Sequence, residues 1–326
     1  MKILVDAMGG DNAPLEIIKG AVSAASVVDA EIVLIGNAKV IKKHLDELPK
    51  RDNIKVKHAS EVITNEDVPT KAIKTKKDSS MVVGFDMIKQ KEGEVFISAG
   101  NTGALLTGAL LNVGRIKGVA RPALCPTLPS LKGPFVIVDA GANTNCRPDY
   151  LVQFAKMGSI YCKNVLGIKN PRVGLVNVGT EEEKGNDLTK ATYGLLKKEK
   201  INFIGNIEGR DIMQGEADVV VCDGFTGNVI LKTLEGFGLA VFGILKSEIQ
   251  KSFTRKVGAL LMKPGLREIK HKMDYTEYGG ALLLGIDGGI IKCHGTSKEK
   301  EIKCAILQAY EFSKNNTIEN IKEAIK

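Results

Sequence analysis

Short apolar runs typical of β-strands alternate with helical stretches along the whole chain. Nine such runs predict strands, at 2–6, 31–36, 54–59, 95–99, 135–140, 172–178, 201–207, 217–223 and 288–294. Runs such as VVVC and FVIV lack polar alternation, as expected of strands that are covered on both faces. This rhythm predicts an α/β protein with a largely parallel sheet. Because no Pro/Ser-rich linker divides the chain, we expect residues 1–326 to form one continuous α/β unit that shares a single sheet.

One apolar stretch, 95–114, has no charge over twenty residues, which is the length of a membrane span. Polar side chains such as Ser98 and Asn112 interrupt it, and Gly100 and Gly103 break it near its centre. We therefore expect a strand, a glycine turn and a buried helix here.

The longest helical region is 227–263, where apolar residues recur at three- and four-residue spacing. This spacing fits an ordinary core helix or a dimer helix. In the following segment, 251–274, seven basic and two acidic residues surround bulky apolar ones, and Pro264-Gly265 predicts a turn. We expect 227–275 to project as a helical unit for dimer and membrane contact. Two alternatives remain open for its basic part: an interfacial membrane contact through Val257, Leu260, Leu261 and Met262, or a solvated hairpin packed on a dimer partner.

Composition narrows the class of protein. The chain is 44% apolar and 26% charged, which excludes disorder for its bulk. Its net charge is +8, and segment 251–274 contributes five of these eight positive charges. This concentration favours an anionic lipid surface or an acidic carrier protein over nucleic acid, and the 5% aromatic content without Trp agrees. Six cysteines without CxxC spacing indicate reduced thiols of a cytoplasmic protein.

A strand–turn–helix construction occurs twice, as VFISAGNTGALL and as VVVCDGFTGNVIL. Such turns lie at the carboxyl edge of a parallel sheet, where ligands bind. Free backbone N–H groups at a helix start suit phosphate, and glycine lets the backbone approach an anion closely. The alternative is ordinary capping with a turn glycine. The candidate phosphate-binding residues in these turns are Asn101, Thr102, Gly103, Thr226 and Gly227, and Asn228 beside them is a candidate for catalysis that could also help to frame phosphate.

Two further turns have a similar character. In DAMGGDNAP, Gly9-Gly10 makes the bend and Asp11 is either a cap or a ligand. In VDAGANTNC, a strand leads to Asn143. The Walker motif, the GxGxxG fingerprint after the first strand and the GxSxG elbow are all absent from the sequence.

Two charged residues are candidates for catalysis. Lys184 follows the strand at 172–178 and has the charge to neutralise an anion, although a solvated loop is the alternative. His294 ends a strand and precedes Gly295, where a hydrogen-bonded structural role is equally consistent with the pattern. No convincing set of metal ligands is seen, so we expect neither metal nor cofactor.

Several long motifs occur together and in order, namely DAMGGDNAP, SAGNTGALL, EEEKGN, NFIGNIEGRDI, ADVVVCDGFTGNVILKTLEG, EYGGALLLG and KCHGTS. Through them the chain closely resembles the bacterial acyl-acyl-carrier-protein:phosphate acyltransferases of phospholipid synthesis, over essentially its whole length. Departures are small: Asn145 stands where the family commonly has Asp, Leu282 where Pro is usual, and CHGTS where SHG is commoner.

The resemblance implies a three-layer αβα, Rossmann-like fold similar to isocitrate/isopropylmalate dehydrogenases and phosphotransacetylases. It implies that inorganic phosphate attacks the thioester of a long-chain acyl-carrier protein and yields acyl phosphate. It further implies a homodimer, peripheral attachment to an anionic membrane, and delivery to a membrane glycerol-3-phosphate acyltransferase. For such a reaction Asn101, Thr102, Thr226 and Asn228 would frame phosphate, Lys184 would neutralise charge, and His294 would assist proton transfer.

Two other classes are weighed against this one. A nicotinamide-dependent decarboxylating dehydrogenase on the same architecture needs a divalent metal held by several Asp residues, which we cannot assemble. A lipid-surface scaffold without catalysis predicts vesicle binding through 251–274 and no consumption of thioester.

Overall fold

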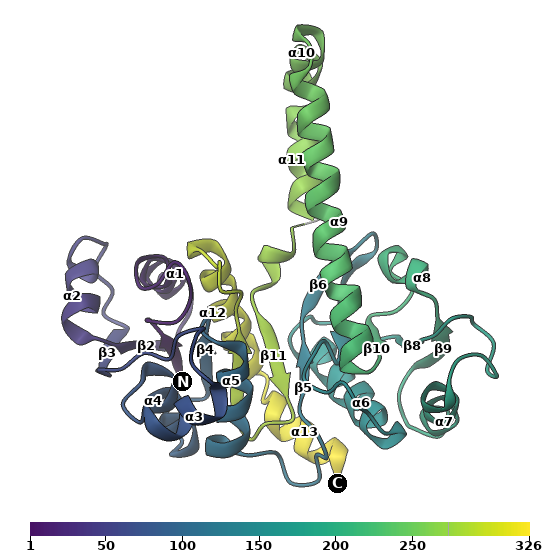
Figure 1. Ribbon diagram of the computed structural model, residues 1–326, viewed down its shortest axis with the longest axis horizontal. Coiled ribbons are helices and arrows are strands. Elements are labelled where there is room, and N and C mark those ends of the chain that lie inside the picture. Colours follow the sequence, from purple (N-terminus) through teal and green to yellow (C-terminus); the bar gives the residue numbers. More distant parts are fainter. Residues whose placement is uncertain (273) are drawn as a thin grey trace.

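The computed structural model describes residues 1–272 and 274–326, without the side chains of 270, 271 and 275, so position 273 of the predicted basic segment lies outside the described residues. Two sheets form the body of the described chain (Figure 1). The seven-stranded sheet has the order β3 (Ile54–His58), β2 (Glu31–Gly36), β1 (Lys2–Asp6), β4 (Val95–Ser98), β12 (Gly289–Lys292), β11 (Ala281–Leu284) and β5 (Ala123–Cys125). The five-stranded sheet has the order β6 (Thr127–Ser130), β7 (Gly133–Val138), β10 (Val219–Val221), β8 (Val173–Val176) and β9 (Phe203–Ile207).

The expectation of one shared sheet is therefore wrong. The chain passes from one sheet to the other at Pro126, which separates β5 from β6 and has no N–H to donate to a ladder. The sheets still touch, because the Ala140 N–H donates to the Leu124 carbonyl at 2.9 Å. This junction brings the edges of the two sheets together.

All nine predicted strands are confirmed as β1–β4, β7–β10 and β12. The sequence reasoning missed β5, β6 and β11. These three are short, and they pair antiparallel, β11 with both β12 and β5, and β6 with β7. The mainly parallel pairing of the other strands agrees with the predicted α/β class.

Helices cover the faces of both sheets, and the predicted strand–turn–helix at 95–114 is confirmed. Their bounds are α1 (Leu15–Ala25), α2 (Ala38–Asp46), α3 (Pro69–Thr75), α4 (Ser80–Lys89), α5 (Thr102–Gly108), the π-helical turn η1 (Ala109–Val113), α6 (Pro148–Asn164), α7 (Asp187–Leu196), α8 (Gly209–Gln214), α12 (Glu299–Lys314) and α13 (Thr317–Ile325).

One apolar core extends through both sheets. It includes Ile3 and Val5 of the first sheet and Val136 and Val138 of the second, all buried. A polar tie reinforces it: the fully buried Tyr161 hydroxyl accepts from Gln308 Nε2 at 2.7 Å and lies 3.2 Å from Thr127 Oγ1. Because Gln308 is on α12 and Tyr161 on α6, this contact links helices of the two halves.

A helical hairpin projects from this body (Figure 1). It consists of α9 (Gly224–Gln250), α10 (Phe253–Leu261) and α11 (Lys263–Lys272), and the short 3₁₀ turn η2 (Tyr275–Tyr278) follows it. Two details of the sequence prediction are wrong. The helix is broken at Lys251–Ser252, and the chain bends at Met262 instead of at Pro264-Gly265. Pro264 lies in the first turn of α11, where its missing N–H has no intrahelical partner to lose.

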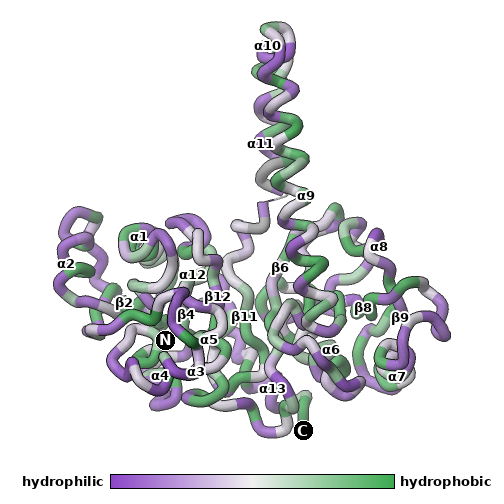
Figure 2. The backbone as a smooth tube through the Cα atoms, in the orientation of Figure 1, coloured by the Kyte–Doolittle hydropathy of each residue, from purple (hydrophilic) through white to green (hydrophobic). Residues whose placement is uncertain are grey.

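Hydrophobic and hydrophilic positions are interspersed along the hairpin, and α9 is more hydrophobic than α11 (Figure 2). Within α9, all of which is described, the buried residues are Gly224, Gly227 and Leu231, and Phe237 and Leu239 are about two-thirds exposed. By length and composition alone, α9 is long and apolar enough to cross a membrane, and only 6% of its most apolar 18-residue stretch is buried in the protein. The first turns of this helix, however, enter the body of the protein.

Candidate active site

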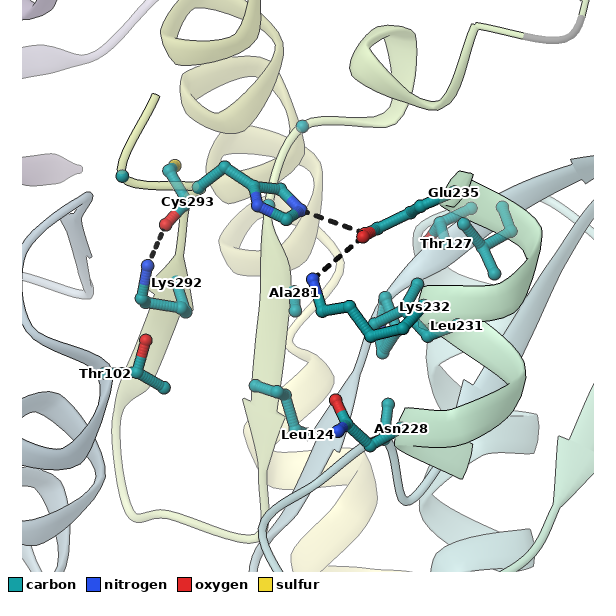
Figure 3. A pocket seen from close by; sticks show the side chains of 17 residues that line it. Thr102, Leu124, Thr127, Asn228, Leu231, Lys232, Glu235, Ala281, Lys292 and Cys293 are labelled. Carbon is teal, nitrogen blue, oxygen red and sulfur yellow. Dashed lines mark hydrogen bonds and ion pairs between the residues drawn. The ribbon is translucent and has the colours of Figure 1, made fainter. Parts of the chain in front are cut away.

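A cavity of about 260 Å³ lies where the two sheets meet (Figure 3). Its walls come from the start of α5, the β5–β6 junction, the end of β7, the first three turns of α9, the start of β11 and the end of β12. Its lining includes Thr102, Asn228, Lys232, Glu235, Lys292 and His294. The carboxyl ends of β4, β7 and β12 thus converge on one cavity, as parallel sheets favour.

Helix α9 contributes three of these side chains. Asn228, Lys232 and Glu235 follow one another at spacings of four and three residues, so they lie on one face of the helix. The carboxylate of Asp223 caps the helix by accepting from the Thr226 N–H at 3.0 Å and from its hydroxyl at 2.7 Å. Gly227 lies so close to Asp139 that a Cβ there would come within 1.9 Å of the Asp139 carbonyl oxygen. The absence of a side chain at 227 therefore sets how deeply the helix enters the cavity wall.

Glu235 organises a small ionic cluster (Figure 3). One carboxylate oxygen lies 2.8 Å from Lys232 Nζ, and the other lies 3.2 Å from His294 Nε2. Burial alone would raise the pKa of Glu235, but the contacts with His294 and Lys232 outweigh it and lower that pKa overall. Glu235 is therefore a carboxylate at neutral pH, and it orients both Lys232 and His294.

Lys292 is the last residue of β12 and lies on the wall opposite α9 (Figure 3). Its ammonium group donates to the Cys293 carbonyl. Burial lowers the pKa of Lys292, and the nearby Lys232 charge adds to this effect. The ammonium groups of Lys232 and Lys292 face one cavity and repel each other. We therefore expect an anion bound between them to stabilise the charged form of both lysines.

Most residues predicted from the glycine turns lie close to this cavity, but several have structural duties. The Asp11 N–H donates to the Gly295 carbonyl at 2.8 Å, so the first turn touches the end of β12. Asn101 caps α5 through a 3.0 Å bond to the Ala104 N–H. Asn143 Nδ2 donates to the Pro122 carbonyl at 2.7 Å. For Asn101 and Asn143 the capping or structural alternative therefore describes the contacts that these side chains make.

Close packing explains the other predicted glycines. A Cβ at Gly9 would lie 2.4 Å from Asp6 Oδ2, and one at Gly10, where φ is +104°, would lie 3.1 Å from the Gly295 carbonyl. A Cβ at Gly103 would meet Pro69 at 2.7 Å. These residues let three turns approach one another beside the cavity.

Two buried aspartates occupy equivalent places at the ends of β1 and β7. Burial raises the pKa of both Asp6 and Asp139. Asp6 accepts from the Ser98 hydroxyl at 2.7 Å, and Asp139 accepts from the Asn143 N–H at 2.6 Å. Each aspartate therefore fixes a neighbouring turn.

Lys184 does not line the cavity. It is exposed in the loop after β8, where its carbonyl accepts from Asn177 Nδ2 at 3.0 Å. The predicted membrane residues Val257, Leu260, Leu261 and Met262 lie far from the cavity, on α10 and the adjoining bend. The structure thus brings Thr102, Asn228 and His294 of the predicted residues to the cavity lining and leaves Lys184 outside it.

The sequence reasoning missed Lys232, Glu235 and Lys292. A signal was present for each. Lys232 and Glu235 continue the helical face begun by Asn228, and Lys292 ends an otherwise apolar strand, GIIK. Among residues 1–272 and 274–326, no group of three His, Cys, Asp or Glu side chains is arranged to hold a metal ion.

Comparison with known proteins shows the family of this chain. The family model described as "Fatty acid synthesis protein" matches residues 1–320. The phosphate acyltransferase of Alkaliphilus oremlandii is 54% identical, with 100% of this chain and 97% of the relative covered. The phosphate acyltransferase of Thermoanaerobacterium thermosaccharolyticum is 53% identical at the same coverage.

Solved structures support the fold. A phosphotransacetylase from Staphylococcus aureus matches with a TM-score of 0.60 at 13% identity, covering 99% of this chain and 94% of its own. A branched-chain phosphotransacylase from Enterococcus faecalis matches with a TM-score of 0.62 at 12% identity, covering 95% and 98%. These likenesses show an α/β, Rossmann-like fold of the phosphotransacylase kind, while the expected likeness to isocitrate/isopropylmalate dehydrogenases stays a prediction. By its family model and its full-length relatives, the chain is an enzyme that belongs to the phosphate acyltransferase family of fatty acid synthesis proteins.

Proposed function

We propose that this enzyme transfers a long-chain acyl group from an acyl-carrier-protein thioester to inorganic phosphate and releases acyl phosphate for phospholipid synthesis. The observation that carries the proposal is the cavity between the sheets, where Lys232 and Lys292 face each other beside His294. Two lysines and one carboxylate leave a positive excess, which suits a phosphate dianion. The names of the full-length relatives agree with this chemistry.

The reaction needs positioning more than proton transfer. A phosphate oxygen attacks the thioester carbonyl carbon, a C–O bond forms, and the carbonyl oxygen becomes an oxyanion. Collapse of this intermediate breaks the C–S bond, and the thiolate leaves with the bonding electrons. Phosphate is already a nucleophile and thiolate a good leaving group, so fixed positive charge is the main requirement.

We assign roles accordingly. Lys292 and Lys232 hold phosphate between them, and Asn228 donates its amide to phosphate or to the oxyanion. His294, held by Glu235 at 3.2 Å, delivers a proton to the departing thiolate. Because Lys184 is exposed on the loop after β8, we assign phosphate neutralisation to Lys292 in its place.

The test of the reaction is thiol release from palmitoyl-acyl-carrier protein with and without phosphate. We expect release that depends on phosphate and yields one hydroxylamine-reactive acyl phosphate per thiol. Release that ignores phosphate, or none at all, would overturn the proposal.

A matched pair of variants tests the assignment of the lysines. Lys292→Met should lower kcat/KM for phosphate by about 100-fold or more, because a preorganised cation is lost, whereas Lys184→Met should stay within about threefold of the wild type. Equal folding is checked by thermal unfolding. The reverse order of effects would return the role to Lys184.

For the hairpin we propose homodimer formation through α9 and α11, and contact with an anionic membrane through the residues around Met262. Leu260 and Leu261 are 66% and 78% exposed, beside the basic residues Arg255, Lys256 and Lys263. Apolar side chains ringed by cations favour an anionic interface. This position would deliver acyl phosphate to a membrane glycerol-3-phosphate acyltransferase.

A further inference from the structure

A second cavity, of about 340 Å³, adjoins the first. The two share Leu128 and Glu235 in their walls. The second cavity is lined by Leu128, Pro129, Met213, Leu234, Glu235, Gly238, Leu239, Phe242, Asp274 and Thr276. It therefore opens beside the ionic cluster of the active site.

The lining of this second cavity is mainly apolar, and its polar residues are Glu235, Asp274 and Thr276. Asp274 is already engaged, because it pairs with Lys300 at 2.8 Å and accepts from the Thr276 hydroxyl at 2.5 Å. Glu235 is engaged by Lys232 and His294. Asp274 and Glu235 thus have protein partners. The surface that remains for a ligand in this cavity is that of leucine, methionine, proline and phenylalanine side chains.

The apolar surface continues along the hairpin. A third cavity, of about 550 Å³, shares Gly238 and Phe242 with the second and is lined by α9 and α11, including Leu245, Ile249 and Leu266. Among the residues of α9 that line the three cavities are Asn228, Leu231, Glu235, Gly238, Phe242, Leu245 and Ile249. They follow at alternating spacings of three and four residues, so they form a single stripe of the helix.

We propose that this stripe is the binding site for the acyl chain of the substrate, with the reacting carbonyl between Lys292 and His294 and the methylenes along Leu234, Gly238 and Phe242. The inference rests on the proposed function, since a carbonyl in the first cavity carries its alkyl chain with it. The chain requires apolar surface that begins at the carbonyl, and the second cavity provides it across the shared Glu235 and Leu128. The alkyl chain then points along α9 toward the tip of the hairpin.

Gly238 offers a clean way to test this assignment. It lines both the second and the third cavity, and no atom lies within 4 Å of a Cβ built there. The first side-chain atom of a leucine at 238 therefore meets no neighbouring atom, and the rest of the side chain occupies space that these cavities offer. Gly236 is the matched control, because its Cβ position is equally open and it lines none of the three cavities.

The experiment compares wild type, Gly238→Leu and Gly236→Leu on acyl-carrier-protein thioesters from butyryl to palmitoyl. We expect Gly238→Leu to keep kcat/KM for butyryl and to lose about fourfold for each methylene that it displaces from the cavity. Gly236→Leu should match the wild type at every length. Equal effects of both variants, or an equal loss at all lengths in Gly238→Leu, would overturn the acyl-chain site.

Two further readouts separate the possible failures. A wild-type enzyme that releases no thiol in a phosphate-dependent way at any chain length contradicts the proposed function itself. Direct binding of a fluorescent C16 fatty acid tests the cavity without catalysis, and Gly238→Leu should weaken it while Gly236→Leu does not. If Gly238→Leu alters the molecular mass of the oligomer measured by light scattering but keeps the wild-type dependence on chain length, the acyl-chain site is overturned and the stripe is a contact with a second copy of this chain.

Discussion

The entry of α9 into the cavity wall depends on one residue without a side chain, Gly227. In Gly227→Ala the new Cβ would lie 1.9 Å from the Asp139 carbonyl oxygen and 3.0 Å from Cys222 Sγ. The first is a backbone atom beside a buried strand, so it cannot turn away. Restoring an ordinary contact of 3.4 Å requires a relative movement of about 1.5 Å between α9 and β7.

Two magnitudes follow from that movement. Overpacking of this kind costs about 1–3 kcal/mol, which lowers the thermal midpoint of a 326-residue chain by roughly 1.5–4.5 °C. A displacement of this size at the start of α9 also moves Asn228, Lys232 and Glu235. Misplacement by about 1 Å lowers catalytic rates on the order of 100-fold. We therefore expect Gly227→Ala to lower kcat on the order of 100-fold while most of the protein stays folded at 25 °C.

Gly236→Ala is the control, because it lies on the same helix with open space around its Cβ position. There the gain in helix propensity should stabilise the protein by about 0.5–1 kcal/mol and leave kcat unchanged. Differential scanning calorimetry and phosphate-dependent thiol release measure both effects. A Gly227→Ala variant that unfolds at the wild-type temperature with wild-type kcat would refute the reasoning.

Three other predictions concern the cavity and the hairpin. Burial lowers the pKa of Lys292, so its side chain loses its positive charge at a lower pH than an ordinary lysine, whose pKa is about 10.5. Phosphate-dependent activity should therefore fall as the pH rises through that lowered pKa. Lys292→Arg should move this fall to higher pH, and an unshifted activity profile from pH 7 to 11 would contradict the prediction. Glu235→Gln removes a negative charge beside the phosphate site and should lower KM for phosphate by about tenfold, which steady-state kinetics with varied phosphate measure; an unchanged or higher KM would remove Glu235 from the site's charge balance. Replacing both Leu260 and Leu261 by Glu should abolish sedimentation with anionic vesicles while thiol release in solution persists, and unchanged sedimentation would assign these side chains to packing instead.

The sequence was informative wherever local pattern decides structure. Nine strands were readable because buried parallel strands are continuous apolar runs. Thr102, Asn228 and His294, which line the cavity, were candidates because each follows such a run or starts the next helix. The strands β5, β6 and β11 were missed because each is only three or four residues long, too short for a clear apolar run, and each is held by antiparallel pairing to a neighbouring strand.

The two lysines, Lys184 and Lys292, show what local pattern does not report, namely which of them lines the cavity. Lys184 stands in a charged loop at a strand end, which is the pattern expected of a ligand-binding residue. Lys292 stands inside a strand motif and looks structural. The boundary between the two sheets at Pro126 decides which lysine lines the cavity. The cavity forms between the sheets, and the loop after β8, which carries Lys184, does not line it. No single segment of sequence reports how two sheets abut.

Helix α9 acts as a spacer of fixed length. It runs without a proline from Glu235 in the cavity wall to Gln250 at the base of the tip, a rise of about 22 Å at 1.5 Å per residue. Glu235 and the base of the tip lie on one unbroken helix, so a carbonyl bound in the cavity would stand at a set height above any surface on which the tip rests. That height is comparable with the extended length of a long fatty chain. An acyl group that grows or shortens by a few carbons would therefore end nearer to or farther from that surface, and the hairpin would serve as a gauge of chain length.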